Sequence, residues 1–241
     1  MYDVDGLFAS MLSDGVYAYA DQLKNAFVTL DGGVRVGVAG EYVTEKGAVS
    51  AVRCITSLNI RIPHDIKGCA DGIFSLTQGR GLKSVLIFSP PGLGKTTMLR
   101  DLARKLGQAN NVLVFDERNE IAAADSDGDG YVLGERCDIV RGGDKLTAFS
   151  CAIRAMKPQV IITDELYGER DFAAVKYAAD CGIAVCASTH ITDMNKLNGL
   201  PFDYFCRLTG IGEKVIVYDK NFDVVRDNCG DDGGWGAAFG R

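Results

Sequence analysis

The fold is decided by one stretch, Ser84-Val85-Leu86-Ile87-Phe88-Ser89-Pro90-Pro91-Gly92-Leu93-Gly94-Lys95-Thr96-Thr97. The apolar run at its start predicts a buried strand over 84–89, and the amphipathic pattern after it predicts a helix over 95–106. The turn between them follows the P-loop pattern G-x-x-x-x-G-K-[ST], with Ser89 in place of the first glycine. A strand, a glycine-rich turn and a helix in this order indicate a binding site for a nucleoside triphosphate.

The chemistry of this turn depends on bare backbone and one cation. Gly92 and Gly94 would let backbone N–H groups approach phosphate oxygens at the amino end of a helix. Lys95 is expected to neutralise the β- and γ-phosphates, and to be exposed to the ligand rather than packed in the core. Thr96 is expected to hold Mg²⁺ through its hydroxyl. The predicted site for ATP and Mg²⁺ comprises Pro91, Gly92, Leu93, Gly94, Lys95, Thr96 and Thr97.

A second pattern lies further along the chain, where an apolar strand over 159–164 ends in two adjacent acids, Asp164 and Glu165. We expect Asp164 to orient the water shell of Mg²⁺, as a Walker-B aspartate does. Glu165 would then polarise the attacking water. The second acid favours an ATPase over a small-molecule kinase, because a kinase rarely needs a group that activates water.

Two further strand ends are expected at the same edge of the sheet. One precedes Asp116-Glu117-Arg118-Asn119-Glu120, and the other is Ala187-Ser188-Thr189-His190. The carboxyl ends of parallel strands are where α/β sheets bind ligands. Glu117 could orient water or Mg²⁺. His190 could sense the γ-phosphate by a hydrogen bond, or it could merely cap a strand end.

The order of elements predicts an α/β fold with a RecA-like core and a mostly parallel sheet, preceded by a small α+β unit. In the small unit, loose helical spacing covers 7–28 and extended runs cover 34–38 and 49–63. In the larger part, strands are predicted at 84–89, 112–117, 159–164, 183–189, 204–209, 213–219 and 223–226, and helices at 95–106, 145–156 and 171–179. The expected domains are 1–66, the small N-terminal unit, 67–226, the P-loop domain, and 227–241, a disordered tail rich in glycine and aspartate.

Composition narrows the class of protein. The chain has 241 residues, ordinary globular hydrophobicity and a net charge of −6, so it lacks the basic field that a dedicated nucleic-acid binder needs. No apolar run reaches membrane-spanning length, and the acidic start is not that of a signal peptide. The eight cysteines form no C-x-x-C pair and are read as reduced thiols of a cytoplasmic protein. Asp125, Asp127 and Asp129 imitate an EF-hand, but Arg136 stands where the twelfth-position glutamate belongs, so we expect an acidic loop instead.

With these motifs in place, the chain resembles the stage III sporulation protein AA family of the P-loop secretion-ATPase superfamily. The resemblance spans about 17–200 and includes the variant P-loop with Ser89. Members of the family carry a longer region ahead of the segment that matches Tyr17, so the resemblance implies that the N-terminal unit is truncated. The segment from Asp116 to Ile121 is similar to the superfamily's Asp box, 153–165 to its Walker-B region, and Ser188-Thr189-His190 to its His box.

The resemblance implies a hexameric ring ATPase in the cytoplasm of a sporulating mother cell, acting on a membrane channel. No arginine stands in the P-loop, at the acidic strand end or at His190, so Arg136 or Arg141 is expected to reach a neighbouring subunit's nucleotide. Two alternatives remain open: a RecA-like or helicase-loader ATPase acting on nucleic acid, and a non-catalytic nucleotide-dependent scaffold.

Overall fold

The computed structural model describes residues 3–12, 15, 19–30, 34–45, 48–62, 65–123 and 130–226. The chain folds into two compact units. The first takes Met1–His64 and Ala123–Tyr131, and the second takes Asp65–Ala122 and Val132–Arg241. The acidic loop with Asp125, Asp127 and Asp129 and the tail over 227–241 lie outside the described residues. The domain limits expected from the sequence stay predictions.

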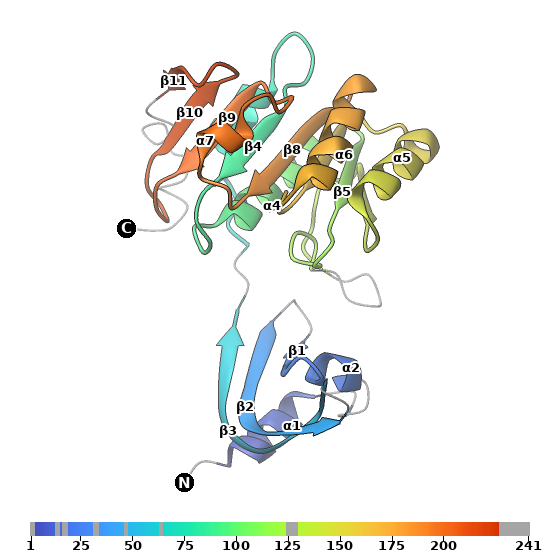
Figure 1. The fold of residues 1–241 in the computed structure, drawn as a ribbon, viewed down its shortest axis with the longest axis vertical. Helices are drawn as coiled ribbons and strands as arrows, with labels where there is room; N and C mark the ends of the chain where they lie inside the picture. The colour runs from blue at the N-terminus through green and yellow to red at the C-terminus, as the bar shows by residue number, and fades with distance from the viewer. Residues whose placement is uncertain are drawn as a thin grey trace. The chain divides into compact units, whose positions relative to one another are not determined.

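The larger unit is built on an eight-stranded sheet within the described residues, in the order β11-β10-β9-β4-β8-β7-β5-β6 (Figure 1). From β9 to β6 neighbouring strands run parallel, and β10 and β11 add an antiparallel edge. The strands are β4 (Val85–Phe88), β5 (Val112–Phe115), β6 (Cys137–Val140), β7 (Val160–Thr163), β8 (Ala184–Thr189), β9 (Tyr204–Leu208), β10 (Val215–Asp219) and β11 (Val224–Arg226).

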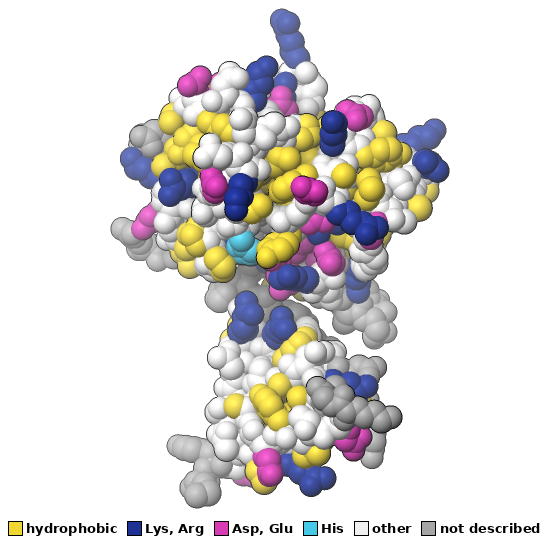
Figure 2. Space-filling view, in the orientation of Figure 1, with side chains coloured by type: hydrophobic (Ala, Val, Ile, Leu, Met, Phe, Trp, Pro, Cys, Tyr) yellow, Lys and Arg dark blue, Asp and Glu magenta, His cyan; other side chains and the backbone are white. Residues whose placement is uncertain are grey.

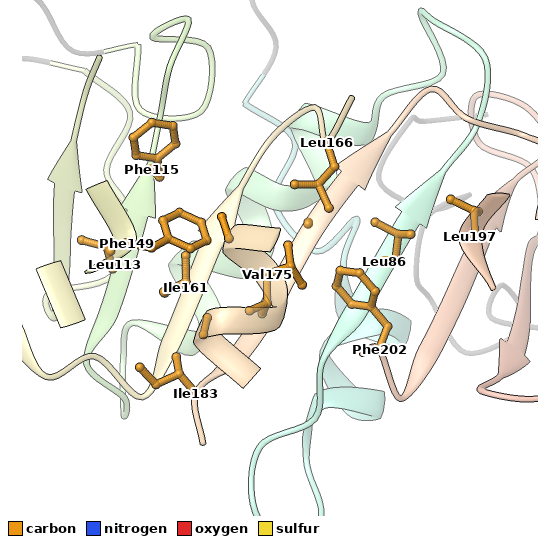
Figure 3. Close-up of a cluster of buried hydrophobic side chains, with 14 of the residues drawn as sticks. Leu86, Leu113, Phe115, Phe149, Ile161, Leu166, Val175, Ile183, Leu197 and Phe202 are labelled. Carbon is orange, nitrogen blue, oxygen red and sulfur yellow. The ribbon is translucent and has the colours of Figure 1, made fainter. Parts of the chain in front are cut away.

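Helices cover both faces of this sheet, as its fully apolar central strands require. They are α3 (Asp71–Thr77), α4 (Lys95–Leu106), α5 (Lys145–Met156), α6 (Glu169–Asp180) and α7 (Met194–Leu197). One core joins Leu86, Phe115 and Ile161 of the strands to Phe149 of α5 and Val175 of α6 (Figure 3). On the opposite face, α4 buries its own apolar side chains, Met98, Leu99, Leu102 and Leu106 (Figure 1).

The smaller unit is a three-stranded antiparallel sheet with two short helices, within the described residues. Its elements are α1 (Val4–Met11), α2 (Ala20–Leu23), β1 (Phe27–Thr29), β2 (Arg35–Glu45) and β3 (Ala48–Arg61). Phe8 of α1 and Val28, Val36 and Val38 of the strands form its core. The helical spacing expected as far as residue 28 is therefore wrong at its end, because Val28 pairs with Val36 in the sheet and its side chain is buried there.

The parallel core confirms the fold class expected from the sequence, and the predicted α4 and α5 have the observed bounds. Three elements of the larger unit were not expected: α3, α7 and the edge strand β6. All are short, and the middle residues of β6 are exposed, so none shows the apolar periodicity of a buried element. Within the described residues, no helix is both long enough and apolar enough to cross a membrane.

Candidate functional site at the carboxyl edge of the sheet

The P-loop has the backbone conformation that its glycines allow. Gly92 and Gly94 have φ of 82° and 83°, in the left-handed region that favours glycine. Gly94 begins α4 as its N-cap, and no side chain of the described residues caps that end by a hydrogen bond. The first backbone N–H groups of α4 are therefore donors suited to an anion.

The Lys95 side chain folds back onto its own loop. Its Nζ donates to the carbonyl oxygens of Ser89 at 2.8 Å and Pro90 at 2.9 Å, and lies 2.8 Å from His190 Nδ1. Only 6% of Lys95 is exposed, so the expectation of an exposed lysine is wrong. Burial lowers the pKa of Lys95 to about 8, although the Glu165 carboxylate acts in the opposite direction. A phosphate would offer this ammonium a charged partner in place of neutral carbonyls.

The register of the sheet brings the four predicted strand ends to one edge. Phe115 of β5 pairs with Thr163 of β7, and Thr163 pairs with Ala187 of β8. Phe88 of β4 pairs with Thr189, so the P-loop leaves the sheet beside His190. In the larger unit, Figure 2 shows charged side chains of both signs gathered beside a histidine.

Asp164 is a buried carboxyl group that lies near other acids. It is 3% exposed, and its pKa is raised to about 7, first by burial and then by the neighbouring carboxylates of Asp116 and Glu120. A divalent cation beside this cluster would relieve the repulsion and favour ionised Asp164. The chemistry of these donors therefore fits Mg²⁺, with the Thr96 hydroxyl as the second predicted ligand.

Asp116, the first residue of the segment similar to the Asp box, holds the loop after β5 in place. Its fully buried carboxylate accepts hydrogen bonds from the backbone N–H groups of Glu120, Ile121 and Ala122. Arg100 of α4 donates to the carbonyl oxygens of Glu120 and Ile121. The role of Asp116 is therefore to shape the loop that presents Glu117 and Arg118.

Glu165 stands in a strained backbone conformation, with φ of 39°. Its N–H donates to Ser188 Oγ at 3.1 Å, so the end of β8 holds the end of β7. One carboxylate oxygen forms an ion pair with Arg118, and the other lies 3.6 Å from His190 Nε2. His190 thus lies between Lys95 and Glu165. The sequence predicted that the three residues share one edge, but not that His190 would contact Lys95.

Lys145, a residue absent from the predicted site, lies in the middle of these acids. Its almost fully buried Nζ contacts Glu117 Oε2 at 2.7 Å, the Glu165 carbonyl oxygen at 3.5 Å and Asp171 Oδ2 at 3.8 Å. Lys145 is the first residue of α5, where the helix dipole disfavours a cation. A lysine in that position was the one local signal that could have identified it.

The two candidate arginines lie at opposite ends of β6, Arg136 at its amino end and Arg141 at its carboxyl end. Arg136 precedes β6, and its Nη1 donates to the carbonyl oxygen of Ala109, before β5 begins. Arg141 follows β6 at the carboxyl edge, directly after Val140, whose carbonyl oxygen accepts from the Asp116 N–H. The fold therefore places Arg141, but not Arg136, at the edge that holds the site of its own subunit.

Comparison with known proteins agrees with this architecture. The family model for sporulation stage III protein AA matches residues 8–223. Stage III sporulation protein AA of Bacillus subtilis is 35% identical over 244 residues, covering 93% of this chain and 80% of the relative. Protein SEEDLING PLASTID DEVELOPMENT 1 of Arabidopsis thaliana is 30% identical over 152 residues, which cover 59% of this chain and 22% of that protein.

Solved structures of low identity share the fold. The pilus retraction motor PilT with bound ADP has a TM-score of 0.51 at 15% identity, covering 85% of this chain and 64% of that one. The ATPase DotB of Legionella pneumophila has a TM-score of 0.52 at 15% identity, covering 90% of this chain and 66% of that one. The RecA-like fold is thus common to these chains, and the sequence match is decisive for the family: this chain belongs to the sporulation stage III protein AA family.

Proposed function

We propose that this chain binds ATP with Mg²⁺ and hydrolyses it, as the motor or assembly ATPase of a secretion-like channel used in sporulation. The observation that carries the proposal is the convergence of Lys95, His190 and Glu165, which come from three separate segments of the chain. A phosphate-binding lysine next to a carboxylate at a strand end is the pairing that phosphoryl transfer to water requires.

Each residue has a proposed part in the reaction. Lys95 and the N–H groups of the P-loop would bind the β- and γ-phosphates. Thr96 and Asp164 would hold Mg²⁺, which would supply positive charge that neutralises the phosphates. Glu165 accepts the proton of the attacking water. His190 reports on the γ-phosphate because it touches both Lys95 and Glu165. Glu117 helps to orient water or the hydrated cation.

The biological role rests on relatives. Membership in the sporulation family, together with solved neighbours that are described as a pilus motor with bound ADP and as an ATPase, supports a cytoplasmic ring that acts on a membrane channel. The alternative, an ATPase that acts on nucleic acid, predicts that single-stranded DNA accelerates turnover. The channel motor predicts no such stimulation.

The test is a binding titration with a fluorescent ATP analogue and Mg²⁺. Lys95→Ala should weaken binding by about tenfold or more, because a hydrogen bond to a charged group contributes about 1.5–3 kcal/mol. Lys176→Ala, at an exposed position of α6, is the matched control and should bind as wild type does. Equal affinity in Lys95→Ala and wild type would overturn the nucleotide site, provided that thermal melting shows both to be folded.

A further inference from the structure

Both oxygens of the Glu165 carboxylate face a cationic or ionisable partner in this structure. Oε2 pairs with Arg118 Nη1, and Oε1 faces His190 Nε2 at 3.6 Å. A carboxylate that serves as a general base needs an oxygen free to accept a proton from water. The Arg118 guanidinium occupies one of the two oxygens.

The backbone around this ion pair is held on both sides, so the side chains are the parts that can move. Glu165 is fixed by Ser188 Oγ and Lys145, and Leu166 N–H donates to the Ser188 carbonyl oxygen at 2.7 Å. Arg118 follows Asp116, whose carboxylate ties down the three N–H groups beyond the turn. The loops after β5 and β7 are thus held by hydrogen bonds, and the Arg118–Glu165 ion pair joins them through side chains that can move.

Neighbouring residues of that turn make two unlike ion pairs. Glu117 pairs with Lys145, which is almost fully buried and is held by α5. Arg118 pairs with Glu165, and its side chain is 58% exposed. In the first pair the exposed partner is the acid, since the Glu117 side chain is 50% exposed. In the second pair the exposed partner is the cation, so a ligand or another protein surface can reach the guanidinium.

We propose that Arg118 is a positioning residue that holds Glu165 in a resting ion pair, and that hydrolysis requires the guanidinium to leave it. The inference rests on the hydrolytic function proposed above. The Arg118 side of this pair is open to solvent, and ion pairs in contact with solvent contribute little free energy, so the resting state is favoured only a few-fold and a modest competing contact releases it. Removing the guanidinium should then raise basal turnover about two- to fivefold, the population ratio that such a pair sustains.

The experiment compares Arg118→Gln and Arg118→Lys with wild type in steady-state ATP hydrolysis at saturating Mg²⁺. Arg80→Gln, in the exposed turn before β4, is the matched control. We expect Arg118→Gln to raise kcat two- to fivefold with KM unchanged. Arg118→Lys, which keeps a cation, should stay close to wild type. Adding NaCl should raise the wild-type kcat towards that of Arg118→Gln, because salt screens exposed pairs.

The outcomes separate the two proposals. If wild type hydrolyses ATP and Arg118→Gln is equally fast or slower, the resting pair is overturned and the ATPase function stands. If folded wild type and Arg118→Gln both bind ATP but hydrolyse none, the ATPase proposal is overturned together with the resting pair. If Arg118→Gln is faster than wild type, and the double variant Arg118→Gln with Glu165→Gln is as fast as Arg118→Gln alone, Arg118 does not act through Glu165.

Discussion

Lys95 and Glu165 are both held by protein groups in this structure, and a bound nucleotide would replace those that hold Lys95. The Lys95 ammonium is bonded to two neutral carbonyl oxygens of its own loop, and the Glu165 carboxylate to Arg118. Charged phosphates are stronger partners for an ammonium than carbonyl oxygens. ATP binding should therefore draw the Lys95 ammonium away from the carbonyl oxygens of its own loop and towards the phosphates.

Glu165→Gln should leave binding of ATP with Mg²⁺ close to wild type but slow hydrolysis by about 10²–10⁴-fold, the usual loss when a general base is removed. The amide keeps the shape of the side chain and cannot take the proton of water. Binding is measured with the fluorescent analogue and turnover by phosphate release. Glu169→Gln, an exposed acid in the first turn of α6, should retain wild-type turnover. Unchanged turnover in Glu165→Gln would make Glu117 the next candidate.

The raised pKa of Asp164, about 7, has a consequence for stability. The pKa of an unfolded aspartate is about 3.9, so between about pH 4 and 7 the folded state binds more protons than the unfolded state. The free energy of unfolding therefore falls as the pH rises through that window. Asp164→Asn removes this titration. Without nucleotide and Mg²⁺, the free energy of unfolding of the variant relative to wild type should therefore rise from pH 5 to pH 8.

The size of this effect has an upper bound of about 4 kcal/mol, since one pKa unit corresponds to about 1.4 kcal/mol. Urea denaturation at several pH values measures it, with Asp180→Asn at the exposed end of α6 as the control. A difference that does not vary with pH would show that Asp164 is ionised throughout. Addition of ATP with Mg²⁺ should stabilise wild type more than the variant, which keeps the P-loop and Lys95 but lacks the carboxylate for Mg²⁺.

At the scale of elements, the carboxyl edge is organised by buried side chains that join one loop to the next. Asp116 shapes the loop after β5, Lys145 joins that loop to α5 and to the end of β7, and Ser188 joins β7 to β8. The reactive groups therefore depend on each other's supports, because each loop is positioned by a neighbour rather than by its own sequence.

Asp116→Asn should destabilise the protein by about 1–3 kcal/mol, the cost of leaving buried hydrogen-bonding groups unsatisfied. An asparagine offers one acceptor oxygen, and its NH₂ group would face N–H donors that now bond to a carboxylate. Hydrogen exchange should accelerate at the amides of 120–122, and urea denaturation gives the loss of stability. Asp138→Asn, exposed on β6, is the control. Unchanged exchange at 120–122 would contradict the anchoring role.

At the scale of the whole molecule, the proposed ring requires a contribution from one subunit to the site of another. Arg136 and Arg141 lie at opposite ends of β6. In a symmetric ring, at most one of them can therefore enter the site of a given neighbouring subunit. Specific activity should rise with protein concentration, because an arginine supplied to phosphoryl transfer contributes about 10³–10⁵-fold in rate.

Mixed assemblies identify that arginine. Subunits with Lys95→Ala, which lack the phosphate lysine, are mixed with subunits carrying Arg141→Ala or Arg136→Ala, and phosphate release is measured. Activity should reappear in one mixture, since each variant spoils a different half of a shared site. Full activity per subunit in a dilute monomer, checked by light scattering, would contradict the shared site.

The sequence by itself determined the parts whose signals are local. The apolar runs of β4 and β7, the glycines of the P-loop and the amphipathic pattern of α4 and α5 predicted the RecA-like core, because strand, turn and helix preferences act over a few residues. Because parallel strands share a carboxyl edge, it also predicted that Lys95, Glu165 and His190 lie at one edge.

Only the tertiary structure decided which side chains meet there. Lys145 and Glu117 are 28 residues apart, and the pairing of Arg118 with Glu165 depends on β5 lying directly beside β7. Lys95 is buried because it folds onto its own loop and His190, and Arg136 and Arg141 are separated because the edge strand β6 lies between them. Such contacts are products of packing between distant segments, and no periodicity or motif in one segment encodes the partner that another will supply.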